Sequence, residues 1–489
     1  MIAARDGTTA GTAAGPAARA PGMRGALAGL SLCILLASLS TSSANVALPT
    51  LAQAFGASFQ AVQWVVLAYL LAITALIVSV GRLGDILGRR RLLLAGLALF
   101  TAASALCGAT PSLWLLVAAR AAQGLGAAIM MALAMALVGE TVAKERTGSA
   151  MGLLGTMSAI GTALGPSLGG ALIAGPGWQA IFLVNIPLGL AALLLARRCL
   201  PADRHAPPAG RARFDIPGTL LLALALIAYA LAMTLGRGSF GALNLVLLVA
   251  ALVGAGLFAF AEARVASPLI RLALLRMPVP AAGFAMSALV STVMMATLIV
   301  GPFHLALALG LAAAPVGLAM SVGPLVAALT GVPAGRRVDR FGAHRMTVAG
   351  LAGMAAGAVL LALLPVSLGV AGYVGPLVLM TAGYALFQAA NNTAVMTGIG
   401  PDQRGVVSGM LNLSRNLGLV TGAAAMGAVF ALGSGTADIA TAAPDAVAAG
   451  TRITFVVAAG LIVGAIAVAL HGHARAARAA RAAGTAGAA

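Results

Sequence analysis

Long apolar segments separated by short polar ones run through nearly the whole chain. Segments of about 20 apolar residues, the length of a helix that crosses the hydrocarbon core of a bilayer, begin near residues 25, 62, 92, 112, 149, 178, 216, 243, 279, 313, 347, 370, 405 and 452. The pattern predicts an all-α integral membrane protein with fourteen transmembrane helices. Residues 1–23 remain as a disordered tail and residues 471–489 as a basic tail.

The positions of the basic residues give the expected orientation. If the amino terminus lies in the cytoplasm, 25 of the 29 Lys and Arg residues fall in cytoplasmic segments, and the exceptions are Arg120, Arg237, Arg415 and Arg452. Such an asymmetry is what the positive-inside rule describes. We therefore expect a multi-pass protein of the cell inner membrane with both termini in the cytoplasm.

Composition excludes several classes of protein. Hydrophobic residues make up 61% of the chain and charged residues 8%, whereas soluble domains carry about 25% charged residues. The net charge of +18 is scattered between apolar segments, so no contiguous basic face for nucleic acid is expected. The three cysteines have neither disulfide nor metal spacing, and the chain has no nucleotide-binding loop or nucleophile constellation. We expect no enzyme activity, no metal and no cofactor.

Two loops share a pattern of residues. Gly81, Asp85 and Gly88 in the loop after the second helix recur at identical spacing as Gly335, Asp339 and Gly342 after the tenth, and Arg89 lies in the basic end of the first loop. A repeat at this distance predicts two homologous halves. The predicted domains are an amino-terminal six-helix half over 24–200, a linker with two extra helices over 201–277, and a carboxy-terminal six-helix half over 278–470.

Small residues mark a close helix contact in the fifth helix. Gly161, Gly165 and Gly169 are four residues apart and therefore lie on one face. Small side chains allow a partner helix to approach closely, and Pro166 removes a backbone donor there. The pattern fits either a flexible contact that moves during function or generic tight packing.

Charged groups within the spans are candidates for function, because an ionisable group in hydrocarbon is costly. Arg120 in the fourth helix and Arg415 in the thirteenth are such cations. The alternative for Arg120 is a pairing with helix carbonyls that only orders the bundle. None of the eleven acids falls in the middle of a span, and Glu140, near the inner end of the fourth helix, comes nearest.

These motifs together resemble the major facilitator superfamily, in particular its fourteen-helix drug:proton antiporter branch. The resemblance covers about residues 25–470 and rests on Asn45-Val-Ala-Leu-Pro49, Gln63-Trp64 with Tyr69, the Gly81–Arg91 loop, Arg120-Ala-Ala-Gln123-Gly124, the Gly161–Gly170 motif, and Phe214-Asp215. It implies two pseudo-symmetric six-helix halves that rock about a central cavity, with a proton gradient as the energy source.

The resemblance also implies roles for single residues. Arg120 would take part in proton coupling, and the Gly161–Gly169 face would close the central path during alternating access. Asp85 would contact the start of the thirteenth helix, near Gln403–Gly405. The chain departs from the family at Ser40, where these antiporters commonly carry an aspartate. Glu140 is the best remaining carboxylate for carrying a proton.

Polar side chains in several spans predict the lining of a substrate cavity. The candidates are Ser40, Ser43, Asn45, Tyr69, Gln123, Phe387, Gln388, Asn391, Asn392 and Asn412. Because buried cations outnumber buried acids, we expect neutral, zwitterionic or anionic substrates.

The sequence favours a secondary active exporter of small amphipathic compounds, driven by proton antiport. The expected partners are a small-molecule substrate and membrane lipid, and we expect a monomer. One alternative is a transporter of a single metabolite or organic anion with the same fold. Another is a non-transporting membrane sensor or scaffold, although the loops are too short for a soluble module.

Overall fold

A computed structural model describes residues 22–77, 79–142, 147–201, 203, 216–235, 241–264, 274, 277–397, 401–436, 439 and 442–486. Its helices are α1 (Gly22–Ala54), α2 (Phe59–Leu76), α3 (Val80–Leu87), α4 (Arg89–Ala109), α5 (Leu113–Thr141), α6 (Thr147–Ala174), α7 (Ala180–Leu183), α8 (Asn185–Cys199), α9 (Ile216–Thr234), α10 (Ala242–Arg264), α11 (Pro278–Phe303), α12 (Ala313–Phe341), α13 (Ala343–Leu363), α14 (Gly369–Met396), α15 (Pro401–Thr421), α16 (Gly427–Gly433) and α17 (Pro444–Ala486). Short π-helical turns, η3 (His304–Ala308) and η5 (Gly422–Met426), extend α11 and join α15 to α16, and η4 (Val366–Leu368) precedes α14.

Fourteen helical segments of the described chain are long and apolar enough to cross a membrane, which confirms the predicted number. The helices α7 and α8 together form the sixth span, and α15, η5 and α16 together form the thirteenth. The last span begins at Pro444, earlier than the sequence predicted, and its helix continues to Ala486 through most of the predicted basic tail. The amino-terminal tail, up to residue 21, lies outside the described residues.

Hydrocarbon offers no partner for a polar group, so the chain satisfies these groups internally. Ser58 and Ser112 cap α2 and α5 by accepting hydrogen bonds from the backbone N–H groups of Ala61 and Leu115. Within the spans, hydroxyls such as those of Thr74, Thr101 and Ser104 donate to the carbonyl four residues earlier. These bonds let polar residues lie inside apolar helices.

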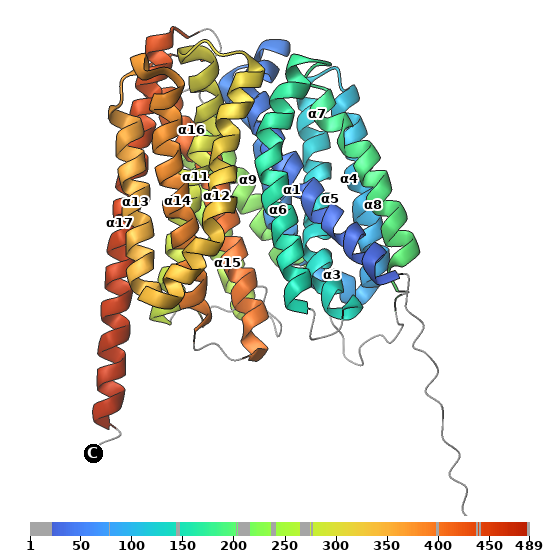
Figure 1. Ribbon diagram of the computed structural model, residues 1–489, viewed down its shortest axis with the longest axis vertical. Helices are drawn as coiled ribbons and strands as arrows, with labels where there is room; N and C mark the ends of the chain where they lie inside the picture. The colour runs from blue at the N-terminus through green and yellow to red at the C-terminus, as the bar shows by residue number, and fades with distance from the viewer. Residues whose placement is uncertain are drawn as a thin grey trace, which may run out of the picture.

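The helices pack as two bundles with the same set of neighbours. In the first half α1 packs on α6 and α8, α4 on α5 and α8, and α2 on α5. In the second half the corresponding pairs are α11 with α15 and α17, α13 with α14 and α17, and α12 with α14. The two halves lie side by side in Figure 1. The structure therefore has the pseudo-symmetric pair of six-helix halves that the repeated loop predicted.

The two extra helices, α9 and α10, form a hairpin beside this pair. The helix α9 packs on α2, where the Trp64 indole donates to the Thr234 hydroxyl at 3.1 Å, and α10 packs mainly on α9. Large apolar side chains such as Leu245 and Leu252 of α10 are exposed, as expected for a helix surrounded by lipid. The predicted domain boundaries at 200 and 277 remain predictions.

Both described chain ends lie at the same end of the molecule, which we call the terminal face (Figure 1). The helix α1 begins there at Gly22, and α17 ends there. Since successive spans alternate in direction, α2 and α12 begin at the opposite end, where α6, α11 and α16 finish. We call this opposite end the closed end, for the packing described below.

The repeated loop has the same backbone turn in both halves. Gly88 separates α3 from α4 with φ 92° and ψ 126°, and Gly342 separates α12 from α13 with φ 86° and ψ 148°. Residues that carry a side chain rarely adopt this backbone conformation, so glycine is required at both positions. A Cβ on Gly88 would also lie 2.5 Å from a carboxylate oxygen of Asp203, whereas a Cβ on Gly342 would meet nothing within 4 Å.

This difference predicts a graded effect of the same substitution. Gly342→Ala should destabilise the protein by about 1 to 3 kcal/mol through backbone strain alone. Gly88→Ala should destabilise it more, because Asp203 must also move. The unfolding midpoint of each purified variant in detergent tests this, with Gly335→Ala, at an unstrained open position, as the control. Equal losses for Gly88→Ala and Gly342→Ala would contradict the role of Asp203.

Candidate functional site

A fully buried arginine lies in the first half, among α1, α2 and α5. The Nε atom of Arg120 donates to the carbonyl oxygen of Val65 at 2.9 Å. Its Nη1 atom donates to the hydroxyl of Ser40 at 2.9 Å and to the side-chain oxygen of Gln123. The sequence singled out Ser40, Arg120 and Gln123 separately, and the structure joins them in one network.

Aromatic and hydroxyl groups complete this Arg120 network. The guanidinium carbon lies 4.1 Å from the centre of the Tyr69 ring, within the range of a cation–π contact. The Tyr69 hydroxyl donates to the Ala37 carbonyl at 3.0 Å, and Gln123 donates to the Ser104 hydroxyl at 2.7 Å. Of the side-chain nitrogens of Arg120, Nη2 alone has no hydrogen-bond partner among the described residues. The cation is thus held mainly by neutral groups of its own half.

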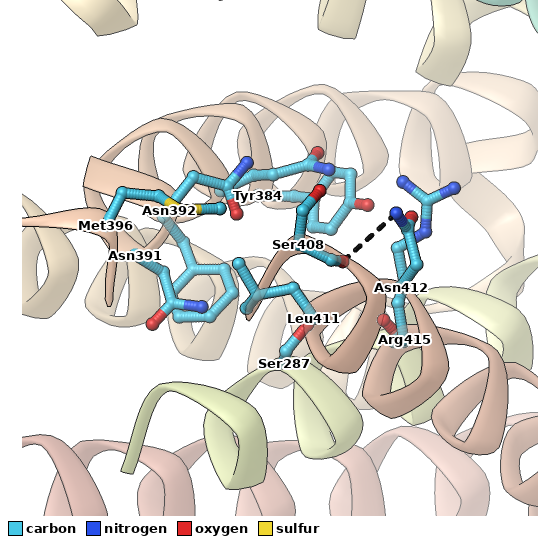
Figure 2. A pocket seen from close by; sticks show the side chains of 12 residues that line it. Ser287, Tyr384, Asn391, Asn392, Met396, Ser408, Leu411, Asn412 and Arg415 are labelled. Atoms are coloured by element: carbon cyan, nitrogen blue, oxygen red, sulfur yellow. Dashed lines mark hydrogen bonds between the residues drawn. The ribbon is translucent and has the colours of Figure 1, made fainter. Parts of the chain in front are cut away.

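A polar pocket lies in the second half, between α11, α14 and α15. It has a volume of about 160 Å³, and Figure 2 shows its side chains. Six residues singled out from the sequence line it: Phe387, Gln388, Asn391, Asn392, Asn412 and Arg415. Sequence reasoning missed Ser287, Ser291, Tyr384 and Ser408, which also line it. These are small or aromatic residues within long apolar runs, where nothing in the pattern distinguishes them from packing residues.

The remaining cavity candidates, all from the first half, do not line this pocket. Ser40, Tyr69 and Gln123 belong to the Arg120 network. Ser43 packs against Gly169, and Asn45 donates to the Thr41 carbonyl at 3.2 Å. The sequence predicted one cavity lined by both halves; in the described residues, the lining of this pocket comes from the second half alone. The sequence could not show which of the polar residues in the two halves line the same cavity.

Aromatic side chains join the halves at the closed end. The centre of the Phe59 ring, in α2, lies 4.8 Å from the centre of the Phe303 ring in α11 and 5.3 Å from the centre of the Phe430 ring in α16. All three side chains are fully buried. Beside them Gln63 donates to the Ala423 carbonyl in the π-helical turn η5 at 3.0 Å. These contacts close the path between the halves on this side.

The glycine motif of α6 contacts helices of both halves. A Cβ on Gly161 would lie 2.7 Å from the Leu35 carbonyl, and one on Gly165 would overlap Ser42, so these glycines face α1. On the other side, a Cβ on Gly317 of α12 would lie 2.3 Å from the Pro166 carbonyl. The backbones of α6 and α12 therefore touch across the two halves at the closed end, which only small residues permit.

The first of the two repeated loops, between α3 and α4, is fixed by an acid that the sequence did not single out. The carboxylate of Asp203 accepts hydrogen bonds from the backbone N–H groups of Arg90 at 2.8 Å and Arg91 at 3.1 Å. It thereby caps α4 from a distant part of the chain and interacts favourably with the helix dipole. Arg90 also donates to the Arg197 carbonyl, at 2.6 Å. The only signal in the sequence is that Asp203 is one of eleven acids.

Several predicted residues stand apart from these contacts. Gly81 and Gly335 have open space at the Cβ position, and Asp339 is exposed at the end of α12. The side chains of Asp85 and Glu140, and those near Gln403–Gly405, lie outside the described residues, so their predicted roles remain predictions. The part of the chain that is described contains no group of three or more His, Cys, Asp or Glu side chains that could bind a metal ion.

A two-half helical bundle with a buried arginine, a glycine contact between the halves and a polar pocket defines a class of membrane transport proteins. A sequence profile of the Major Facilitator Superfamily matches residues 30–423. The chain belongs to this family.

Relatives of known sequence and structure agree with this assignment. The chain is 34% identical to the uncharacterized transporter YebQ of Escherichia coli, over 83% of this chain and 88% of that protein. It is 31% identical to the riboflavin transporter RibZ of Clostridioides difficile (81% and 86%) and 34% identical to the multidrug resistance protein Stp of Mycobacterium tuberculosis (79% and 72%). The crystal structure of the peptide transporter POT shares the fold, with a TM-score of 0.67 and 16% identity over 91% of this chain and 94% of that one.

The two intramembrane arginines should differ in their effect on stability. Arg120→Gln removes the hydrogen bonds from the guanidinium to the Val65 carbonyl and the Ser40 hydroxyl, and a hydrogen bond to a charged group contributes about 1.5 to 3 kcal/mol. Arg415→Gln breaks no bond to a described residue. We expect a clear fall in the unfolding midpoint for Arg120→Gln and little change for Arg415→Gln, measured by thermal unfolding in detergent. A midpoint equal to wild type for Arg120→Gln would refute the structural role of its network.

The contact between α6 and α12 should depend on Gly317. Gly317→Leu places a side chain where the Pro166 carbonyl lies, so the helices must separate by several ångströms. Spin labels at Ala174 and Ala312, with the native cysteines replaced by serine, report that distance by pulsed electron resonance. Gly331→Leu is the matched control, since a Cβ there meets nothing within 4 Å. An unchanged distance in Gly317→Leu would show that the contact at Gly317 does not determine the separation of α6 and α12.

Proposed function

We propose that this protein is a secondary active exporter of the cell inner membrane, which moves small amphipathic compounds out of the cytoplasm in exchange for protons. It acts by alternating access, in which the two six-helix halves rock about a central path. The observation that carries the proposal is the polar pocket of the second half, near the terminal-face ends of α14 and α15, in a molecule whose halves are closed at the other end. That arrangement suits loading from the terminal face.

The terminal face is the cytoplasmic side in this proposal. The described basic residues at helix ends there include Arg24, Arg90, Arg197, Arg264 and Arg337. An excess of cations on one side is characteristic of the cytoplasmic face of inner-membrane proteins. Both termini would then lie in the cytoplasm.

The direction and breadth of transport are supported by relatives. The relative Stp is named a multidrug resistance protein, which supports the export of varied compounds, and family membership supports the alternating-access mechanism. The pocket is consistent with substrates of mixed character, since amides and hydroxyls line it beside the rings of Tyr384 and Phe387.

The second candidate function is transport of a single metabolite. The similarity to RibZ, named for riboflavin, favours it. The same fold serves both functions, so a narrow or a broad substrate profile distinguishes them.

Proton coupling can be measured in everted membrane vesicles that contain the protein. A pH gradient is established and followed with a fluorescent amine, and cationic, neutral and anionic aromatic compounds are added one at a time. We expect substrates to dissipate the gradient faster than in vesicles with the Arg120→Ala variant at equal protein level. Gradient-independent uptake of a compound would replace antiport with facilitated diffusion. A response to one compound out of a broad panel would favour the single-metabolite transporter.

A further inference from the structure

The charge balance of the pocket points to the chemical class of its ligand. Among the described residues, its lining contains one charged side chain, that of Arg415, which is half-buried in α15 and lies within the membrane span Val407–Gly433. None of the described residues forms an ion pair or a hydrogen bond with this guanidinium. An unpaired cation within a membrane span is energetically costly, so an anionic group beside it would be stabilised.

Arg120 and Arg415 differ in their surroundings. Arg120 is fully buried, bonded to three groups of its own half and covered by the Tyr69 ring. It has no access to the pocket. Arg415 has the opposite situation, since its guanidinium lies beside a cavity and is free of protein partners among the described residues. Arg120 therefore stabilises the packing of the helices in its own half, whereas Arg415 is available to bind a ligand.

The neighbours of Arg415 define the rest of the ligand. The amides of Gln388 and Asn392 have no hydrogen-bond partner among the described residues, while Asn412 donates to the Ser408 carbonyl at 3.2 Å. Figure 2 shows Asn392 and Tyr384 of α14 facing the side of α15 that carries Ser408 and Arg415. Free amides can bind carbonyl or hydroxyl oxygens, and the Tyr384 ring offers an aromatic surface.

We propose that this pocket binds aromatic organic anions, with a carboxylate of the substrate paired to Arg415 and its ring packed beside Tyr384. The inference deepens the proposed export function, since it names the substrate class of the same site. A bidentate pairing of guanidinium with carboxylate suits a planar acid better than a neutral or cationic compound.

Two fluorescent probes with one fluorophore and opposite charge test this directly. Dansylglycine ends in a carboxylate and dansylethylenediamine in an ammonium group, and their binding to the purified full-length protein in nanodiscs is followed by dansyl fluorescence. We expect the wild-type protein to bind dansylglycine more tightly. Arg415→Gln should weaken dansylglycine binding at least about tenfold, the effect of losing about 1.4 kcal/mol, and leave dansylethylenediamine binding unchanged or stronger.

Matched variants separate charge from folding. Arg415→Lys retains the charge but not the planar fork, so we expect intermediate affinity for dansylglycine. Arg452→Gln removes an arginine of the same half that lies outside this pocket, and it should leave both affinities unchanged. The unfolding midpoint of each variant shows that the protein is intact.

Other outcomes overturn the proposal. A wild-type protein that prefers dansylethylenediamine, or binds neither probe, does not have an anion site, and dansylglycine binding that survives Arg415→Gln places the anion elsewhere. The vesicle assay keeps the two proposals apart. Arg415-dependent binding without gradient dissipation would sustain the anion site and reject proton antiport, whereas proton-coupled transport of cations insensitive to Arg415→Gln would do the reverse.

Discussion

Hydrocarbon supplies no hydrogen bonds, and this constraint shapes every level of the structure. It makes each span a helix, because only then does the backbone satisfy itself within one segment. It turns hydroxyls back onto their own helix, as at Thr74 and Ser104. It also surrounds Arg120 with a carbonyl, a hydroxyl and an amide. Where a polar group escapes this rule, as Arg415 does among the described residues, a ligand becomes the natural partner.

The Arg120 network shows how a cation is accommodated without an acid. In a low-dielectric interior, charge-assisted hydrogen bonds are stronger than those between neutral groups. Here they come from three helices, so the arginine ties α1, α2 and α5 together. Ser40 accepts a hydrogen bond from Arg120, at the position where the sequence resemblance leads one to expect an aspartate. The hydroxyl provides a neutral acceptor for the guanidinium, and the coupling proton would have to be carried by another group.

The closed end and the pocket lie toward opposite ends of the bundle. Rings of Phe59, Phe303 and Phe430 meet at one end, next to the glycine contact between α6 and α12. The polar pocket lies toward the other end, beside the last turn of α14 and the early turns of α15. A rocking motion of the halves would have to break the aromatic contact and the α6–α12 contact. Because Gly170 and Gly317 have no side chains, the two helices pack there backbone to backbone, without interlocking side chains.

The sequence by itself determined the number of spans, the two-half organisation and the position of the repeated turn. These features depend on local properties: the length of an apolar run fixes a helix, and a glycine at a fixed spacing fixes a turn. Six pocket residues of α14 and α15, such as Gln388 and Asn412, were also singled out, because most of them are polar or charged side chains within apolar runs. The sequence could not show that Ser40, Tyr69 and Gln123 belong to the arginine network instead of the pocket, nor that Asp203 caps α4. Those assignments depend on which helices meet and at what height, and only the tertiary packing of the spans decides that.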